Sequence, residues 1–333
     1  MRPRLPDLRQ PLFDNPLGRR VMHTLQAASD RRLLAQVDRG DAVRHQALAL
    51  LALVHQARST PFGRDHDFAR IRTPHDYRRL VPLQRTAGPT SPVAERSYRH
   101  ALGVALALTQ EARPRSICWL GDGEPSERFP LLARPCVFGP DTLPRGPSPA
   151  CLIGPVDRII AFAHDRRHLM PDVRAVIYTH GGASAAALRQ AVGPVPTLLE
   201  LLTRPEGPVA VEDPRYGSLR LLVDSGLYFE FIPNPGTDAV NPPRVGLDEV
   251  RVGIPYELVL TAPGVWAARA GLAVTFDRLD PPLVRVLTLP TPAVAGRRDA
   301  ETVQAPHRSS IGIPAAHRGT FAHTPWSARA DRG

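Results

Sequence analysis

The sequence predicts an α/β fold, and three observations carry that prediction. A strand-like run at 173–178 is followed by a glycine turn at 181–182 and a helical stretch at 183–191, the strand–turn–helix order of an α/β layer. Short apolar runs separated by turn residues then continue to residue 261. Proline accounts for 37 of the 333 residues, roughly twice its average share, which favours many short elements over a bundle of long helices.

Helical patterning dominates the amino-terminal part. Apolar residues recur at helical spacing over about 21–57, and Gly40 divides this stretch into two expected helices. Thr73 followed by Pro74 is typical of a helix start, because threonine caps the first turn and proline fits its first position. We expect that helix to end before Pro82, since the residue preceding a proline is excluded from helical geometry.

Strands are expected in the rest of the folded part. A buried strand at 116–120 leads into a tight polar loop at 121–126. Residues 134–155 are crowded with proline and glycine, so we expect an irregular crossing there. Later strands are expected at 208–211, 219–222, 228–232 and 256–261.

The composition changes near the carboxy-terminal end. Residues 291–333 contain little aliphatic periodicity and much arginine, histidine, alanine, proline and serine. Such a segment cannot bury enough apolar surface to offset the entropy of ordering. The expected organisation is therefore one α/β domain over 1–290 and a disordered tail over 291–333.

The charge of the chain bears on its partners. The formal net charge is +10, and all 42 basic residues are arginine. Arginine pairs well with phosphate groups, so nucleic acid has to be considered as a partner. The arginines are scattered in pairs and not gathered in one stripe, which argues against a nucleic-acid-binding surface. A nucleic-acid binder that uses the arginines of 291–333 remains a further hypothesis.

Cysteine usage and apolar run lengths indicate the compartment. Cys118, Cys136 and Cys151 are odd in number and too widely spaced for a C-x-x-C pair, which favours a reducing compartment over a disulfide framework. The longest apolar runs, at 47–54 and 101–108, are far shorter than the roughly 18 residues of a membrane span. The sequence therefore predicts a cytoplasmic protein without a membrane partner.

Several motifs occur in a characteristic order. They are Ser-Thr-Pro-Phe-Gly at 59–63 with Val-Pro-Leu at 81–83, Met-Pro-Asp-Val-Arg at 170–174, Glu-Gly at 206–207 with Tyr-Phe-Glu-Phe-Ile-Pro at 228–233, and Tyr-Glu-Leu-Val-Leu-Thr at 256–261 with Arg-Ala-Gly at 269–271. This order resembles that of the auxin-responsive acyl-acid-amido synthetases, the Gretchen Hagen three family of adenylate-forming enzymes. The resemblance covers about residues 50–287.

The resemblance implies the amino-terminal domain of an acyl-adenylating, firefly-luciferase-like enzyme. Such an enzyme binds ATP with magnesium and a carboxylic acid, forms an acyl-adenylate with release of pyrophosphate, and passes the acyl group to an amine. The family continues into a smaller carboxy-terminal domain that often brings a lysine. We expect that domain to be missing here, because only the predicted tail follows and the chain has no lysine.

The resemblance also assigns roles to residues. Glu206 matches the family's catalytic or magnesium-binding glutamate. The positions that correspond to nucleotide-binding residues are Gly121, Gly123, Ser126, Arg128, Gly207, Arg269 and Gly271. Without the resemblance, 121–126 is an ordinary acidic surface turn and Glu206 a solvated loop acid.

The motifs depart from the family pattern at three places. Asp122 and Glu124 bring negative charge to the phosphate loop, and Pro125 removes a backbone donor. Leu272 replaces the aspartate that binds the ribose, and a leucine cannot accept its hydrogen bonds. We therefore expect activity to be reduced or lost, and the alternative is a non-catalytic ligand-binding or interaction protein derived from the family.

Two further patterns have structural interpretations. His164 and His168 have the i, i+4 spacing of metal ligands on a helix, but no third ligand stands at a telling distance. Tyr228, Phe229 and Phe231 lie on a predicted strand and are expected to be core aromatics and not a base-stacking platform.

Overall fold

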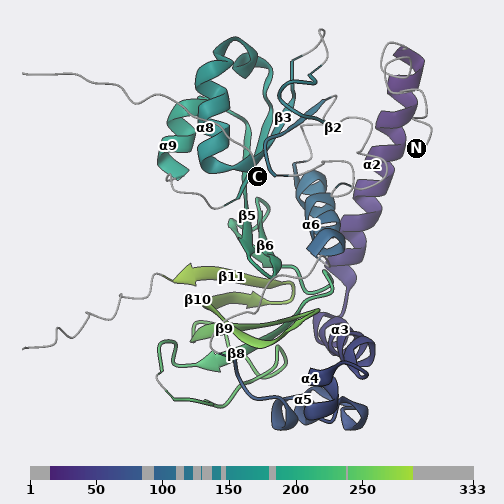
Figure 1. Ribbon diagram of the computed structural model, residues 1–333. Helices are drawn as coiled ribbons and strands as arrows, with labels where there is room; N and C mark the ends of the chain where they lie inside the picture. The colour runs from purple at the N-terminus through teal and green to yellow at the C-terminus, as the bar shows by residue number, and fades with distance from the viewer. Residues whose placement is uncertain are drawn as a thin grey trace, which may run out of the picture. The chain divides into compact units, whose positions relative to one another are not determined.

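The structure is a computed structural model that describes residues 16–84, 94–109, 116–122, 129, 137–143, 148–179, 185–237 and 239–287. The strands of these residues form one sheet of eleven, in the order β2-β1-β3-β4-β5-β6-β7-β11-β10-β9-β8 (Figure 1). Neighbours from β2 to β5 are parallel, and neighbours from β5 to β8 are antiparallel. The predicted tail at 291–333 lies outside the described residues, so its disorder stays a prediction.

The parallel half of the sheet confirms two predicted strands and corrects one expectation. Its strands are β1 (Ile117–Trp119), β2 (Val137–Phe138), β3 (Cys151–Pro155), β4 (Ala175–Thr179) and β5 (Thr197–Arg204). β1 and β4 coincide with the predictions at 116–120 and 173–178. The irregular crossing expected at 134–155 is wrong in part, because β2 and β3 lie within it. β3 is hydrogen-bonded between β1 and β4, partners that local composition does not reveal.

The antiparallel half contains all four strands predicted after residue 207 and two that were missed. Its strands are β6 (Gly207–Asp213), β7 (Ser218–Leu221), β8 (Tyr228–Pro233), β9 (Pro255–Ala262), β10 (Val265–Leu279) and β11 (Pro282–Leu287). The missed strands are β10 and β11. β11 pairs with β10 on one side and with β7 on the other, so it joins the two halves of the sheet.

The helices begin and end where local signals predict. They are α2 (Pro16–Arg39), α3 (Ala42–Ala57), α4 (Pro61–Asp65), α5 (Pro74–Leu80), α6 (Ala94–Leu108), α8 (Val156–Asp165) and α9 (Ala185–Val192), with 3₁₀ turns η1 (Phe68–Arg70) and η3 (Arg167–Asp172). Gly40 separates α2 from α3, and Thr73 caps α5 in a capping box with Asp76. In the described part of the chain, no helix is both long and apolar enough to cross a membrane.

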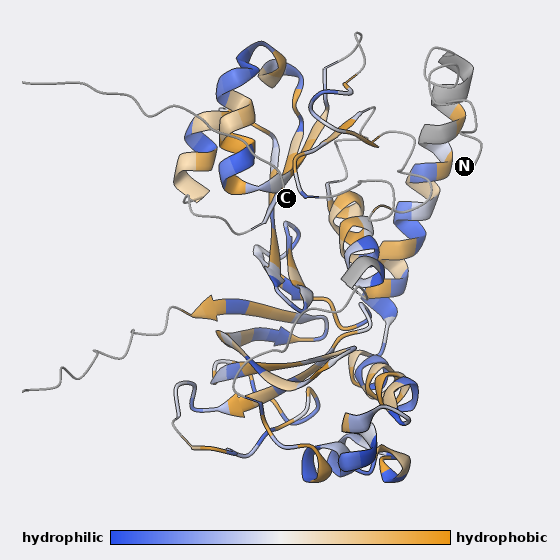
Figure 2. Cartoon of the chain, viewed as in Figure 1, coloured by the Kyte–Doolittle hydropathy of each residue, from blue (hydrophilic) through white to orange (hydrophobic). Residues whose placement is uncertain are grey.

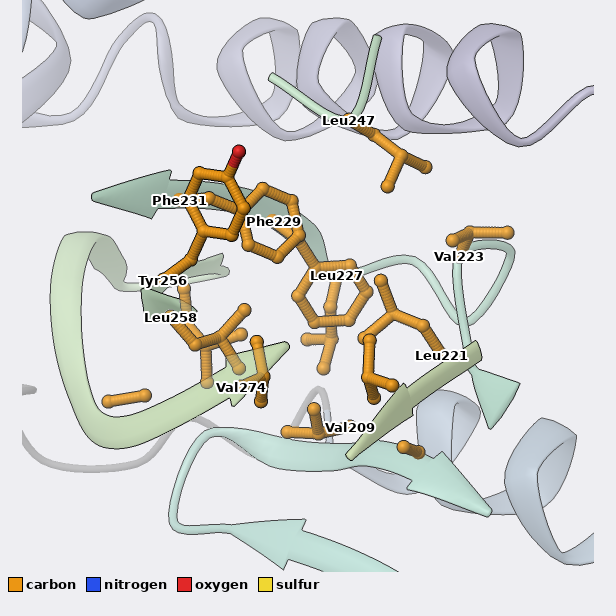
Figure 3. Close-up of a cluster of buried hydrophobic side chains, with 14 of the residues drawn as sticks. Val209, Leu221, Val223, Leu227, Phe229, Phe231, Leu247, Tyr256, Leu258 and Val274 are labelled. Atoms are coloured by element: carbon orange, nitrogen blue, oxygen red, sulfur yellow. The ribbon is translucent and has the colours of Figure 1, made fainter. Parts of the chain in front are cut away.

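Helices and sheet enclose separate cores. α6 is coloured largely hydrophobic in Figure 2, whereas α2 alternates between polar and apolar turns. α6 packs its buried Ala101, Val104 and Leu108 against the sheet with Leu201 and Val211. The antiparallel half has its own core, in which the side chains labelled in Figure 3 gather, among them Leu221, Leu227, Phe229, Leu258 and Val274. The predicted core aromatics Tyr228, Phe229 and Phe231 are confirmed as buried.

A buried carboxylate shares β8 with these aromatics. Glu230 has no exposed surface, and its Oε2 accepts a hydrogen bond of 2.9 Å from Nη1 of Arg244. Arg244 also donates to the backbone oxygens of Arg78 and Val81, at 3.1 and 2.7 Å. Burial raises the pKa of Glu230 to about 7, against the lowering effect of Arg244.

A second buried ion cluster ties α2 to the sheet. Asp213 at the end of β6 is fully buried and accepts from Nε of Arg220 at 2.9 Å and from Arg215. Nη2 of Arg220 lies 2.9 Å from Oδ1 of Asp38, in the last turns of α2. Burial raises the pKa of Asp213, but the hydrogen bonds from Arg215 and Arg220 outweigh it, so this pKa lies below its usual value.

The remaining chemical groups weighed from the sequence are structural. Cys118 is buried, and burial raises the pKa of its thiol to about 12, as expected of an inert cysteine. Cys136 lies outside the described residues. α8 ends at Asp165, so His164 and His168 do not share a helix face. Within the described ranges, no group of three or more histidine, cysteine, aspartate or glutamate residues is placed to hold a metal.

Candidate functional site

The parallel strands direct their carboxyl ends toward one edge of the sheet, where open α/β sheets bind ligands. β1 ends at Trp119 and leads to Gly121, and β5 ends at Arg204 and leads to Glu206. The register sets Trp119 level with Leu199 through β3 and β4, so β5 extends further past the edge than β1 does. Two of the regions that the sequence singled out therefore lie at the same edge.

Gly121 is required by packing. An added β-carbon would stand 2.2 Å from Cζ2 of Trp119, a distance that no real side chain tolerates. The indole of Trp119 therefore closes over the backbone at Gly121. This contact explains the glycine without any phosphate, so the predicted nucleotide role of Gly121 stays a prediction.

Asp122 is paired with an arginine from α8. Its Oδ1 accepts from Nη2 of Arg158, while Nη1 of Arg158 donates to the backbone oxygen of Leu120 at 3.2 Å. Arg158 thus neutralises one of the two acids that depart from the family's phosphate loop. Gly123, Ser126 and Arg128, the other loop residues predicted to bind nucleotide, lie outside the described residues.

Glu206 lies at the tip of the β5–β6 hairpin. Arg204 pairs with Gly207 across the two strands, so Pro205 and Glu206 form the turn between them. Glu206 is only 8 % exposed, and its Oε2 is buried with no hydrogen-bond partner among the described residues. The interpretation of Glu206 as a solvated loop acid is therefore wrong. A buried carboxylate oxygen without a donor is costly unless a cation or a ligand satisfies it.

Gly207 shows what surrounds the tip. A β-carbon at Gly207 would lie 3.4 Å from Cδ1 of Leu227 and 4.0 Å from Cβ of Ser97. Leu227 precedes β8, and Ser97 lies in the first turn of α6. The turn that carries Glu206 is thus packed between the loop before β8 and the start of α6, which fixes the position of the carboxylate.

Arg204 connects the hairpin tip to β10. Its Nη2 lies 3.8 Å from the place of a β-carbon on Gly271, and its Nε is buried without a hydrogen-bond partner in the described part of the chain. Gly271 has φ +60°, in the left-handed region where glycine is favoured. A guanidinium nitrogen therefore approaches Gly271 close to the buried turn of Glu206, and both ionic groups retain an unused hydrogen-bonding atom.

Arg269 has protein partners instead. Its Nη2 donates to the backbone oxygen of Thr237 at 2.9 Å, and its Nε lies 3.5 Å from Oε1 of the nearly buried Glu257. These contacts give Arg269 a role in fixing β10 against β9 and the loop after β8. Its predicted role in nucleotide binding is not tested by them.

The next position completes the departure from the family pattern. Leu272 is partly buried and packs against the hydrophobic core of the antiparallel half. Ala268, in place of a family aromatic, is almost fully buried. Neither side chain offers a polar atom to a ligand at this place.

The structure thus brings together a subset of the predicted residues. Glu206 and Gly207 form the hairpin turn, and Gly271 lies against Arg204, two residues after Arg269. Sequence reasoning missed Arg204 as part of the site, having noted it only as a replacement for a small residue. No periodicity or motif marks it, since its approach to Gly271 depends on the pairing of distant strands.

Comparison with known proteins identifies the fold. No family model and no curated protein matches the sequence. Among solved structures, the chain resembles the AtGH3.15 acyl acid amido synthetase in complex with 2,4-DB, with a TM-score of 0.55 and 10 % identity over 78 % of this chain and 70 % of that chain. It also matches the Klebsiella oxytoca NpsA N-terminal subdomain in complex with 3-hydroxyanthranilyl-AMSN, with a TM-score of 0.34 and 12 % identity over 58 % of this chain and 57 % of that one.

The first of these similarities confirms the predicted fold. The order of elements and the mixed sheet are those of an acyl acid amido synthetase, at an identity that speaks for the fold alone. The α/β fold expected from the motif order at 59–271 is therefore present.

Proposed function

We propose that this chain, which has the fold of an acyl acid amido synthetase, binds ATP with magnesium and a carboxylic acid at the β5–β6 hairpin tip, with adenylating activity that is reduced relative to that of the synthetases. In the full reaction a carboxylate oxygen attacks the α-phosphorus of ATP, and the bond to the β-phosphate breaks to release pyrophosphate. The nitrogen of an amine then attacks the acyl carbon, and AMP leaves. A cytoplasmic location stays a prediction from the sequence.

The observation that carries the proposal is the buried, unpartnered Oε2 of Glu206. Magnesium is bound in proteins through one or two carboxylates together with substrate phosphates. Glu206 fits such a role, because its carboxylate is held in a packed turn and retains a free acceptor. A magnesium ion held there would supply positive charge beside the phosphates.

Arg204 supports the same proposal. The chain has no lysine to neutralise phosphate charge. The Nε of Arg204 is unpartnered, and its guanidinium lies next to Gly271, one position before the place of the family's ribose anchor. A guanidinium can donate two parallel hydrogen bonds to a phosphate, so Arg204 is the cation that we assign to this ligand.

The reduction in activity is argued from the other site positions. Leu272 cannot hydrogen-bond a ribose, and Gly121 and Asp122 are engaged with Trp119 and Arg158. Catalysis of this kind depends on positioning and on stabilisation of phosphate charge. A chain that holds the ligand through Glu206 and Arg204 alone forfeits most of both effects.

The test is acid-stimulated exchange of pyrophosphate into ATP, together with calorimetry of Mg-ATP binding. We expect measurable Mg-ATP binding that is lost in Glu206→Gln and kept in Asp172→Asn, an exposed control of matched chemistry. Slow exchange with at least one carboxylic acid is expected. Absence of Mg-ATP binding to the folded wild-type chain at millimolar ATP contradicts the proposal.

The alternative is a non-catalytic binding protein with the same fold. Binding of Mg-ATP or a carboxylic acid without pyrophosphate exchange is its signature. Leu272 favours this alternative, because the ribose anchor contributes to positioning and is replaced by a side chain that packs into the core.

A further inference from the structure

A pocket of about 390 Å³ lies between α9 and β11, away from the hairpin tip. One row of side chains crosses the sheet beneath it. The register sets Tyr178 of β4 beside Glu200 of β5, while Leu219 of β7 lies beside Glu212 of β6 and beside Val284 of β11. The volume equals that of roughly thirteen water molecules at about 30 Å³ each, which is the size of a small organic ligand.

The floor of the pocket is negatively charged. Glu200 and Glu212 both line it from neighbouring strands, and Oε2 of Glu212 accepts from the backbone nitrogen of Glu200 at 3.1 Å. Tyr178 is only 6 % exposed. Burial, together with the charges of Glu200 and Glu212, raises the pKa of its hydroxyl to about 12. Two carboxylates and a neutral phenol thus converge on one space.

The rim does not reverse this charge. Arg285 lines the pocket, but its Nη2 lies 3.1 Å from Oδ2 of Asp277, which also accepts from the hydroxyl of Ser218 at 2.7 Å. Asp277 therefore balances Arg285. The remaining lining charges are the exposed Arg189 of α9 against two glutamates, which leaves one negative charge in excess.

The geometry points to a binding site for a small organic monocation. We infer that a primary ammonium group binds between Glu200 and Glu212, with a short apolar body against Leu219, Val284 and Val286. Charge-assisted hydrogen bonds from the ammonium to two carboxylates provide the recognition, and the apolar wall adds hydrophobic burial.

This site is separate from the one proposed for ATP. Glu200 precedes Arg204 by four residues on the same strand, which is about 13 Å at about 3.3 Å per residue. The inference therefore stands or falls independently of adenylate formation.

The first experiment uses three probes that share one alkyl chain and differ in charge. Hexylammonium, hexan-1-ol and hexanoate are titrated into the full chain and followed by ligand-observed NMR. We expect hexylammonium to bind on the order of tenfold more tightly than hexanol, and hexanoate not to bind. Equal binding of hexylammonium and hexanol, or tighter binding of hexanoate, overturns the inference without any variant.

The second experiment places the ligand. Glu200→Gln and Glu212→Gln preserve shape and remove charge, and each is expected to weaken hexylammonium binding on the order of tenfold while leaving hexanol unchanged. Asp172→Asn is the exposed control, and Glu206→Gln is expected to bind hexylammonium like the wild type, which separates this site from the hairpin tip. Hexylammonium affinity that both pocket variants retain, in chains shown by circular dichroism to be folded, overturns the inference.

Discussion

The indole of Trp119 occupies the place where a β-carbon on Gly121 would stand, with Cζ2 2.2 Å away. The residue that the family pattern assigns to phosphate binding therefore has a packing role of its own. A variant at this position separates the two roles.

Gly121→Ala is expected to destabilise the chain by about 1–3 kcal/mol, because the added methyl displaces a buried ring. Denaturant unfolding followed by tryptophan fluorescence measures this change. Mg-ATP affinity of the folded variant is expected to match that of the wild type. A variant of wild-type stability that binds Mg-ATP more weakly would show that Gly121 serves the ligand and not the packing.

Leu272→Asp is expected to strengthen nucleotide binding. Aspartate restores an acceptor for the ribose hydroxyls beside Gly271, and a hydrogen bond to a charged group contributes about 1.5–3 kcal/mol. The cost is a lower stability, since Leu272 packs against the core of the antiparallel half. Calorimetry with ATP and with the 2′,3′-dideoxy analogue measures the gain.

Leu272→Asn is the matched control, because it has the same size and can accept a hydrogen bond but carries no charge. We expect it to gain less than Leu272→Asp. If neither substitution raises ATP affinity, or if the dideoxy analogue gains as much as ATP, the assignment of this position to the ribose is wrong.

Glu230→Gln is expected to change how stability depends on pH. Burial raises the pKa of Glu230 from 4.5 to about 7 in the folded chain, so the folded state binds a proton that the unfolded state releases. That contribution is complete below pH 4.5 and is lost as the pH rises through about 7. Arg244 keeps its bonds to the carbonyls of Arg78 and Val81 in either protonation state.

Thermal unfolding at several pH values between 5 and 8 tests this dependence. The melting temperature of the wild type is expected to fall relative to that of Glu230→Gln across this range, because glutamine cannot titrate. A difference between the two chains that stays constant with pH, or that grows in favour of the wild type, would mean that Glu230 is charged throughout.

Asp213→Asn is expected to cost about 3–5 kcal/mol of unfolding free energy, because it leaves Arg220 buried without its carboxylate. The pKa of Asp213 is lowered in the folded chain, so its contribution is present above 3.8 and is lost as the pH falls below that value. Asp165→Asn, at an exposed pair with Arg166, is the control and is expected to cost less than about 1 kcal/mol. A loss no larger than that of the control would contradict a structural role for the cluster.

Elements with local signals were predictable from the sequence. Thr73 and Pro74 mark the start of α5, and Gly40 marks the break between α2 and α3, because each signal acts within one turn of helix. β10 was missed because Ala267 and Gly271 interrupt its apolar alternation. Its stability comes from pairing with β9 and β11, which lie on either side of it only in the folded chain.

The candidate site was predictable only where a motif marks it. Glu206 and Gly207 belong to such a motif, but the burial of Glu206 depends on packing around the hairpin turn. Glu200 and Glu212 stand out in the sequence as charges within apolar strands. Only the register of three neighbouring strands brings them together beside Tyr178, and no local pattern encodes a register between distant segments.

The position of β11 between β7 and β10 has a consequence for synthesis. β7 pairs with β6 immediately, but its other neighbour comes after β8, β9 and β10 in the chain. At about 5–20 residues per second, Pro282 leaves the ribosome roughly 3 to 12 s after Leu221. During that interval the nascent chain carries an open strand edge, to which another chain could add. Arg220, a charge within β7, acts as a gatekeeper on that edge until the last strand arrives and encloses it.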